Sequence, residues 1–286
     1  MNQTLDLDQS SDPEPVKNCW RACIGAIRRN AMVAGVFRLV VPATRSAIDD
    51  CRRCEARCRS LCGSVPDGQL AEIADILEAV HARPHQRIIV EGDPACHTYN
   101  IVSGAAKLLK ELPDGRQQVV GFLLTGDFFG LPAGGTYPYS VEAIAETHLC
   151  RFRLDRFEAV LSRIPALEAA LRDRLVGDLA AAQEQMLTLG QKSALERVAG
   201  FLLQISARAE CLGLPHNPMH LPMIRSDIAD YLGLTLETVS RCFGRLKERG
   251  LITVCGRHEI NFESVAGLGI SPKAAMHRRP TPLKET

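Results

Sequence analysis

Apolar residues recur with two different periods along the chain, and the change of period marks two structural regions. Between residues 87 and 153, short apolar runs are separated by glycine, proline and aspartate, which is typical of the strands of a sandwich or barrel. From residue 155 onward, apolar residues return every three or four positions, which predicts helices. The pattern therefore predicts a sheet domain followed by a helical part.

The predicted strands are short and evenly spaced, and Pro113-Asp114-Gly115 forms a turn between two of them. They are expected at residues 87–93, 99–104, 106–110, 117–124, 141–145 and 147–153. Ahead of them, residues 67–82 are predicted to form a helix. One face of this helix would carry Leu70, Ile73, Ile76, Leu77 and Val80. The first 14 residues are polar and acidic, which predicts disorder.

A long helix is predicted over residues 166–189, and it carries a narrow apolar stripe. Successive members of the stripe are four, three, four and three residues apart, as in the heptad seam of a coiled coil. They are Leu175, Leu179, Ala182, Met186 and Leu189. Such a stripe can pack on its own domain, but the helix length and the narrow stripe favour a two-stranded coiled coil between subunits. A second helix is predicted over residues 193–210.

Residues 225–250 show the pattern of two helices joined by a tight turn. The helices are predicted over residues 225–232 and 236–249, and Gly233 can adopt the left-handed conformation that the turn requires. The side chains predicted to face outward on the second helix are Glu237, Ser240, Arg241 and Arg245. This is the pattern of a helix-turn-helix, in which the second helix, residues 236–249, is the reading helix that recognises DNA. Residues 251–262 are predicted to form a hairpin wing beside it.

Composition narrows the possible functions. A chain of 286 residues can form two domains, and its net charge of +1 means that any DNA binding depends on a local basic patch. No apolar run is long enough to span a membrane. Arg28-Arg29 precede an apolar stretch, as in a secretion signal, but Arg38 interrupts that stretch. We therefore expect a cytoplasmic protein.

Four of the eleven cysteines lie within twelve residues, and arginines separate them. They are Cys51, Cys54, Cys58 and Cys62. In a reducing cytoplasm disulfides are rare, so this density of thiols indicates a metal or iron–sulfur site. The spacing alone does not choose between zinc and iron–sulfur. The interleaved Arg52, Arg53, Arg57 and Arg59 would offset the negative charge of such a site.

Residues 225–241 closely resemble the DNA-binding motif of the Crp/Fnr family of bacterial transcription regulators. Their sequence is Arg-Ser-Asp-Ile-Ala-Asp-Tyr-Leu-Gly-Leu-Thr-Leu-Glu-Thr-Val-Ser-Arg. Glu91-Gly92-Asp93, Gly104 and residues 121–130 resemble the glycine-marked turns of the family's β-roll. The resemblance implies an α+β fold with a cyclic-nucleotide-binding-like β-roll, a long dimerisation helix and a winged helix-turn-helix.

This resemblance also divides the chain. The expected parts are a partly disordered N-terminal extension (1–50), a cysteine-bearing sensor segment with the β-roll (51–165), the dimerisation helix (166–190), the DNA-binding domain (191–267) and a disordered tail (268–286).

Within this family, the Fnr branch binds a [4Fe–4S] cluster, and one of its patterns is Cys-x2-Cys-x7-Cys with one further central cysteine. Cys51, Cys54 and Cys62 match the first three positions, and Cys150 matches the central one. The resemblance implies these four residues as ligands, while the additional Cys58 could replace Cys62 or Cys150. It also implies an oxygen-sensing activator that dimerises anaerobically on TTGAT-type inverted repeats and works with RNA polymerase.

Two other regulators of the same fold remain possible at this point. One would sense through zinc or redox-active thiols, and the other would bind DNA constitutively and respond to another signal. An enzyme is disfavoured, because radical iron–sulfur enzymes need Cys-x3-Cys-x2-Cys and the sequence offers no acid–base pair.

The motif match implies that Glu237, Ser240 and Arg241 read base edges. Arginine can bond guanine O6 and N7 together, and glutamate can accept a hydrogen bond from cytosine N4. Residues predicted to contact phosphates, which position the protein without specifying sequence, are Arg225, Ser226, Thr235, Thr238 and Arg245.

No cyclic nucleotide is expected to bind. Family members that bind cAMP carry a Gly-Glu and, further on, an Arg-Ser that holds the phosphate. Here Gly130 is followed by Leu131-Pro132, and Tyr139-Ser140 stands at the Arg-Ser position. The cyclic phosphate would therefore lack a charged partner.

Overall fold

The computed structural model describes residues 38–39, 47–211, 213, 215–256, 258–264 and 268 of the chain. Most of the predicted N-terminal extension and C-terminal tail, with the disorder predicted there, lie outside these residues. Helix α2 (Ala47–Arg53) crosses the division predicted at residue 51. Within the described ranges, no helix is both long enough and apolar enough to cross a membrane.

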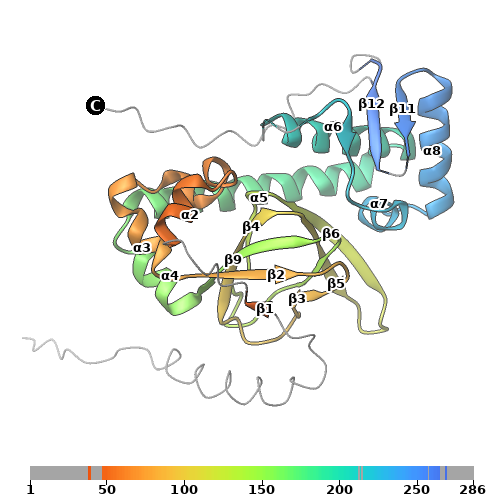
Figure 1. Ribbon diagram of the computed structural model, residues 1–286. Coiled ribbons are helices and arrows are strands. Elements are labelled where there is room, and N and C mark those ends of the chain that lie inside the picture. The colour runs from red at the N-terminus through yellow and green to blue at the C-terminus, as the bar shows by residue number, and fades with distance from the viewer. Residues whose placement is uncertain are drawn as a thin grey trace, which may run out of the picture.

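Two antiparallel sheets form the β-roll in the centre of Figure 1. The first has the order β1 (Arg38–Leu39), β2 (Leu77–Ala82), β9 (Thr147–Arg153), β4 (His97–Ser103) and β7 (Phe128–Phe129). The second has the order β3 (Arg87–Ile89), β8 (Ser140–Ala143), β5 (Ala105–Glu111) and β6 (Gln117–Leu124). Ile101 and Leu149 of the first sheet pack with Val141 of the second in one apolar core, so the predicted strands are confirmed.

The helix predicted over residues 67–82 is wrong in its second half. A 3-10 turn, η3 (Asp67–Gln69), leads into the short helix α3 (Leu70–Ala74). The chain then becomes strand β2, which pairs with β9 from Leu77↔Phe152 to Ala82↔Thr147. Each sheet face buries alternate residues, and in β2 these are Val80 and Ala82. Tertiary pairing therefore overrides the local helical spacing.

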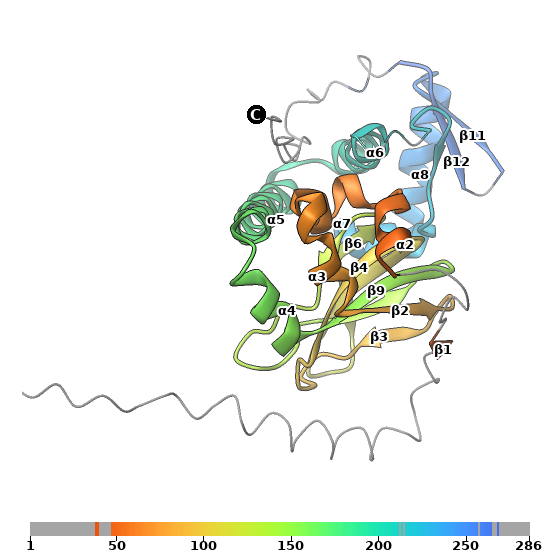
Figure 2. The same ribbon diagram turned by 60° about the vertical axis from the view of Figure 1, so that its left-hand side comes forward.

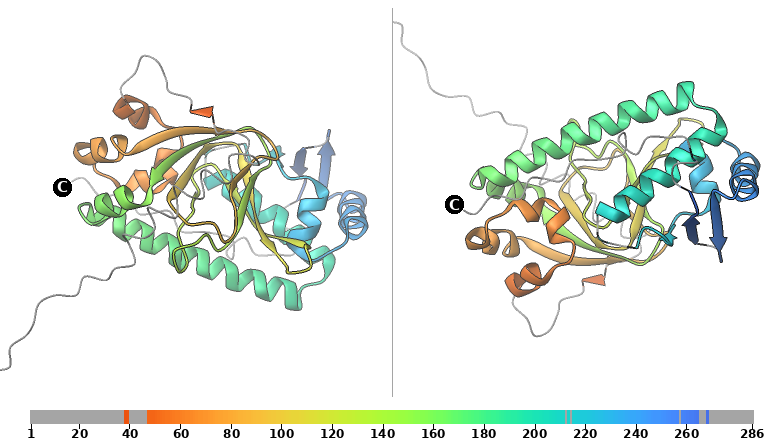
Figure 3. Two further views of the ribbon diagram at one scale, coloured as in Figure 1. Left: turned by 90° about the horizontal axis from the view of Figure 1, so that it is seen from below. Right: turned by 90° about the horizontal axis from the view of Figure 1, so that it is seen from above.

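Helix α4 (Leu154–Leu161) leads into α5 (Pro165–Gln191), which has proline at its first turn, where no hydrogen bond is lost. Both views of Figure 3 place α5 along one edge of the molecule. Its first part is anchored, because Leu167 and Leu171 are buried beside α4. The predicted long helix is confirmed.

The predicted DNA-binding domain contains six elements: α6 (Ala194–Cys211), β10 (Met219–His220), α7 (Arg225–Leu232), α8 (Leu236–Glu248), β11 (Ile252–Cys255) and β12 (Glu259–Phe262). Its three strands have the order β10-β12-β11. The helix-turn-helix and the hairpin wing are therefore confirmed.

One apolar cluster joins this domain to the β-roll. Phe122 of β6 packs against Phe201 of α6 and Tyr231 of α7, with ring centroids 5.8 and 5.3 Å apart. Beside this contact, Lys107 Nζ of β5 donates to Asp227 Oδ1 of α7 at 2.8 Å. The helix-turn-helix is thus docked on the β5–β6 hairpin.

Candidate functional site

The cysteine segment, residues 51–62, folds against the first sheet of the β-roll. Cys51 lies on α2, Cys54 follows that helix, and Cys62 lies on the 3-10 turn η2 (Leu61–Ser64). Cys150 lies on β9, about one hundred residues further along the chain. Cys51, Cys62 and Cys150 pack on the same apolar cluster, which includes Phe152. Figure 2 shows α2 and α3 on the same side of the strands as α5.

The thiols of this group influence one another electrostatically. Burial raises the pKa of Cys150 well above its ordinary value, and the neighbouring Cys62, Cys54 and Cys51 raise it further. Burial also raises the pKa of Cys62 to about 11, with further contributions from Cys51 and Cys54. The pKa of Cys51 is raised by burial and by Cys54. The four cysteines predicted as ligands therefore share one neighbourhood.

Cys58 lies apart from this group. Its side chain is exposed, and its Sγ donates a weak hydrogen bond to the Glu55 carbonyl oxygen at 3.6 Å. It is not among the neighbours that raise the pKa of Cys51 or Cys150. It lines a surface hollow of about 300 Å³ together with Cys54 and Arg57. Cys58 thus differs from Cys51, Cys62 and Cys150 in its exposure, although it shares a surface hollow with Cys54.

Arg57 is the arginine of this segment that is tied to the thiol group. Its Nη2 donates to the Val65 carbonyl oxygen at 3.1 Å and to Asp67 Oδ1 at 2.6 Å, which fixes the side chain. Its positive charge acts to lower the pKa of both Cys51 and Cys62, opposing the effect of burial. Arg57 is thus the one of the four interleaved arginines whose charge acts on both the Cys51 and the Cys62 thiol.

The four thiols form a donor set that could hold a metal ion or an iron–sulfur cluster. Among the described residues, no three His, Cys, Asp or Glu side chains are grouped closely enough for a single metal ion. One zinc ion gathers four thiolates at about 2.3 Å, whereas a [4Fe–4S] cluster takes one thiolate on each iron, so its ligands stand further apart. Thiolates are ligands for both groups, so the donor set suits a [4Fe–4S] cluster as well as a zinc ion.

Two buried polar atoms on this side of the sheet lack hydrogen-bond partners among the described residues. They are Thr98 Oγ1 and Asn100 Oδ1 of β4. Asn100 is paired with Cys150, and Thr98 with Phe152, so both side chains point to the same face as Cys150. A buried polar group without a partner costs about 1–3 kcal/mol. On this face the Thr98 hydroxyl can donate or accept a hydrogen bond, whereas Asn100 Oδ1 can only accept one.

The reading helix is positioned by the turn before it. Gly233 ends α7 with φ 61° and ψ 42°, the left-handed conformation predicted for it. Thr235 caps α8 by accepting a hydrogen bond from the Thr238 backbone N at 3.1 Å. Glu237, Ser240 and Arg241 are exposed on α8, as predicted. Glu237 and Arg241 form an exposed pair at 3.8 Å.

Arg225 has a structural contact that the sequence did not reveal. Its guanidinium carbon lies 3.0 Å from the centroid of the Phe243 ring, and burial lowers its pKa to about 10. Its Nη1 is buried and has no hydrogen-bond partner among the described residues. The side chain predicted to contact a phosphate therefore also packs on the reading helix through Phe243.

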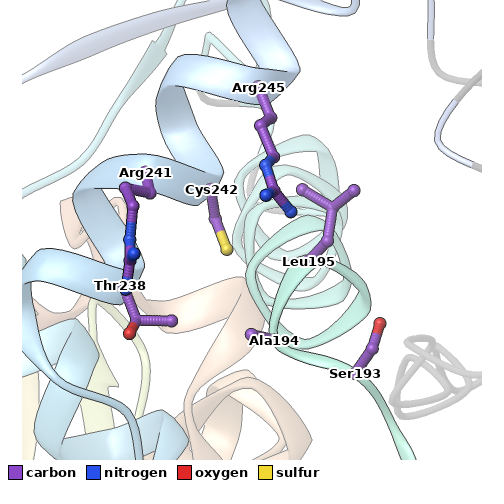
Figure 4. A pocket seen from close by; sticks show the side chains of 7 residues that line it. All are labelled: Ser193, Ala194, Leu195, Thr238, Arg241, Cys242 and Arg245. Carbon is purple, nitrogen blue, oxygen red and sulfur yellow. The ribbon is translucent and has the colours of Figure 1, made fainter.

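A cavity of about 460 Å³ lies between the start of α6 and the reading helix (Figure 4). It is lined by Ser193, Ala194, Leu195, Thr238, Arg241, Cys242 and Arg245. Sequence analysis singled out its α8 side but missed its α6 side. Ser193 and Glu196 exchange hydrogen bonds in a capping pattern at the start of α6, where the helix over residues 193–210 was predicted to begin. Two arginines beside it make the cavity suitable for an anion.

The predicted seam of α5 is exposed in the single chain. Leu179 is 60% exposed and Met186 is 71% exposed, although both are large apolar side chains. Leu175, Leu189 and Ala182 are exposed as well. Val176 and Leu187 extend the exposed apolar stripe beyond the heptad positions that the sequence predicted. A stripe of this kind marks an interaction surface.

In the region where a cyclic nucleotide would lie, polar groups bond to one another. Tyr139 Oη accepts a hydrogen bond from the Gly130 backbone N at 3.3 Å, and Ser140 Oγ accepts one from the Glu91 backbone N at 2.9 Å. Tyr139 and Ser140 occupy the position of the Arg-Ser pair, so these contacts take the place of a phosphate-binding arginine.

Comparison with known proteins gives two family matches. The model of the cyclic nucleotide-binding domain matches residues 79–164, and the model of the Crp-like helix-turn-helix domain matches residues 196–269. The nitrogen fixation regulation protein FixK of Bradyrhizobium diazoefficiens is 37% identical over 204 residues, covering 71% of this chain and 86% of that protein. The transcriptional activator protein FnrL of Cereibacter sphaeroides is 37% identical over 222 residues, covering 76% and 90%.

A solved structure agrees with these matches. FixK2 from Bradyrhizobium japonicum superposes with a TM-score of 0.64 at 36% identity, covering 68% of this chain and 96% of that protein. The match extends over nearly the whole of that regulator.

Proposed function

The chain belongs to the Crp/Fnr family of DNA-binding transcription regulators, and we propose that it is an oxygen-responsive activator holding a [4Fe–4S] cluster on Cys51, Cys54, Cys62 and Cys150. Its relatives are regulators and not enzymes. RNA polymerase and promoter DNA are its expected partners in the cytoplasm.

The observation that carries this proposal is that Cys150 of β9 lies beside the cysteine segment. Cys51, Cys62 and Cys150 pack on one apolar cluster, although about one hundred residues separate the two parts of the chain, and Cys51, Cys54 and Cys62 add to the rise in the pKa of Cys150. Cys58, which is nearer in sequence to the first three, takes no part in this effect. This supports the ligand set that includes Cys150 over one in which Cys58 replaces it.

The cysteine segment is well placed to report the state of its thiols. The bound cluster would supply an oxygen-sensitive link between this segment and β9. The 3-10 turn η2, which carries Cys62, packs against α5, whose exposed seam leads toward the DNA-binding domain. Loss of the cluster would break the link between the cysteine segment and β9 and leave η2 free to shift against α5. This shift would move the equilibrium between dimer and single chain toward the single chain.

For dimerisation, we propose that the α5 seam pairs with the same seam of a second chain. An α5–α5 coiled coil would bury Leu175, Leu179 and Met186, which are exposed in the single chain. The symmetric dimer would then present two reading helices to successive major grooves, which suits an inverted repeat.

For DNA recognition, we propose that Arg241 and Glu237 read one G·C pair of a TTGAT-type half-site, with Ser240 beside them. All three are exposed on α8. The cavity beside Arg241 and Arg245 would seat a backbone phosphate, with Thr238 as a further donor. The hydrogen bonds made by Tyr139 and Ser140 support the proposal that the protein changes its DNA affinity without binding a cyclic nucleotide.

The test is anaerobic purification followed by iron and sulfide quantification and a visible spectrum. We expect about four irons and four sulfides per chain, as the cluster formula requires, together with a brown chromophore and loss of dimer and DNA binding in air. Colourless protein containing zinc would instead identify a zinc regulator of the same fold. DNA binding that is indifferent to air, in protein without iron, would identify a constitutive regulator.

A further inference from the structure

Asp127 is a buried carboxylate at the meeting point of three parts of the molecule. It lies in the turn between β6 and β7 and is 6% exposed. Its Oδ1 accepts a hydrogen bond from Arg174 Nη2 of α5 at 2.8 Å. Its Oδ2 accepts one from Arg208 Nη2 of α6 and another from the Leu124 backbone N at 2.8 Å. One carboxylate therefore joins the β-roll to the dimerisation helix and to the DNA-binding domain.

We call Asp127, Arg174 and Arg208 the junction. Its carboxylate stays ionised and paired with the two guanidinium groups. Burial alone would raise the pKa of Asp127, but the two guanidinium groups bring it below its ordinary value. Removing one partner of a buried charge group is costly, because the remaining charge has lost its solvation. The three side chains are therefore expected to move together or to exchange partners together.

Two hydrogen bonds fix the Asp127 turn to the strand beside Cys150. The Asp127 carbonyl oxygen accepts from the Ile101 backbone N at 2.9 Å, and the Gly126 backbone N donates to the Ile101 carbonyl oxygen at 2.8 Å. Ile101 directly follows Asn100, the residue of β4 that pairs with Cys150. The turn and the central cysteine are thus held by one strand.

The cysteine segment rests on the same turn. Gly126 has φ 88°, and a Cβ added there would lie 2.9 Å from Arg59 Cβ and 3.3 Å from the Arg59 carbonyl carbon and oxygen. Arg59 lies on the 3-10 turn η1 (Arg57–Arg59), between Cys54 and Cys62. The contact is close enough that displacement of the segment must change the packing on Gly126, next to Asp127.

We propose that Asp127 is a positioning residue that transmits the state of the cysteine segment to α5 through Arg174 and to α6 through Arg208. Arg59 of the cysteine segment packs on Gly126, which precedes Asp127 in the turn between β6 and β7. The turn presents the carboxylate to the helix that dimerises and to the helix that carries the DNA-binding domain. In Figures 1 and 2, α5 and α6 lie on the same side of the β-roll.

The chain offers matched variants. Asp127→Asn removes the charge of the junction, and Arg208→Gln removes the link to α6 while keeping the pair of Asp127 with Arg174. Asp178→Asn is the control, because Asp178 also pairs with Arg174, at 3.0 Å, but is half exposed and lies outside the junction. If Asp127→Asn does not fold, Arg208→Gln carries the test.

The experiment measures DNA affinity of the full chain under anaerobic conditions and after exposure to air, with iron and sulfide content and dimer mass measured on the same samples. We expect Asp127→Asn and Arg208→Gln to load the cluster normally, and the anaerobic-to-aerobic ratio of DNA affinity to fall by about tenfold, within the range typical of coupling between sites. Asp178→Asn should keep the ratio of the unmodified protein.

This inference rests on the proposed function, and the same samples separate their failures. If the unmodified protein lacks iron and does not respond to air, the proposed function fails. If the unmodified protein responds and Arg208→Gln, folded and loaded, responds equally, the role of Asp127 is overturned. A merely structural role would lower both affinities together and leave the ratio unchanged, which also overturns it.

Discussion

Asn100 lies directly opposite Cys150 in the antiparallel ladder of β4 and β9. Its side chain is 3% exposed, and its Oδ1 has no hydrogen-bond partner among the described residues. Side chains that face each other in such a ladder have Cβ atoms about 4.5–5.5 Å apart. A carboxamide is therefore fixed beside the central cysteine, on the face that the cysteine segment covers.

This relationship makes Cys150→Ser a clean test of ligation. A serine hydroxyl at this position can donate to the carboxamide of Asn100, so the strand pairing and the fold should be preserved. We expect anaerobically purified Cys150→Ser to lose most of its iron and sulfide, because hydroxyl is a poor ligand for an iron–sulfur cluster. Visible absorbance and iron content measure the loss, and circular dichroism checks the fold.

Cys58→Ser is the matched control for Cys150→Ser. Cys58 is exposed, whereas Cys51, Cys62 and Cys150 pack on one apolar cluster. We expect this variant to keep the iron content and the visible spectrum of the unmodified protein. The opposite result, with Cys58→Ser colourless and Cys150→Ser brown, would show that Cys58 is a ligand and Cys150 is not.

The sequence predicted best those elements that depend on residues close to one another in the chain. The helix-turn-helix has helices at 225–232 and 236–248, because the turn glycine, the Thr235 cap and the apolar spacing all act within a few residues. Residues 67–82 were predicted less well. Their apolar spacing suits a helix, but a strand partner that lies seventy residues away decides the structure of the second half. Intrinsic preference is a weak guide where tertiary pairing can override it.

The parts of the site that depend on distant contacts were predicted only by resemblance or not at all. The resemblance linked Cys150 to residues 51–62, but it left the role of Cys58 open. Asp127 looks like an ordinary residue of a Gly-Asp turn. Only the fold brings Arg174 and Arg208, 47 and 81 residues away, to its carboxylate.

The second prediction concerns the α5 seam. Leu179→Lys should leave the single chain folded, because Leu179 is 60% exposed there, and it should weaken the dimer by placing a charge in the coiled-coil core. Asp173→Lys introduces the same side chain at an exposed position on the opposite side of the helix and serves as the control. Anaerobic sedimentation or light scattering measures the mass. A dimer of unchanged strength in Leu179→Lys would contradict the seam.

The third prediction separates the two roles of Arg225. Arg225→Ala should lower DNA affinity equally for all sequences and reduce the slope of log affinity against log salt by about 1, as expected for a lost phosphate contact. It should also lower the free energy of unfolding by about 0.5–2 kcal/mol, because the contact with the Phe243 ring is lost.

Arg245→Ala provides the comparison, since Arg245 is exposed. It should reduce the salt slope by a similar amount while changing the free energy of unfolding by no more than about 0.5 kcal/mol. If Arg225→Ala lowers stability and leaves the salt slope unchanged, Arg225 is a packing residue and does not contact phosphate.

The last prediction concerns base readout by Arg241. In the free protein this arginine is paired with Glu237 at 3.8 Å, and both side chains are largely exposed. An exposed i,i+4 pair contributes only about 0.3–0.5 kcal/mol, so both groups can turn to a base pair at little cost.

Arg241→Ala should weaken specific binding by about 1–3 kcal/mol and relax the preference for guanine at one position of each half-site. Binding to a set of half-sites substituted at each position measures both effects. Arg249→Ala, beyond the end of α8, should leave the base preference intact, and an unchanged preference in Arg241→Ala would exclude Arg241 from base readout.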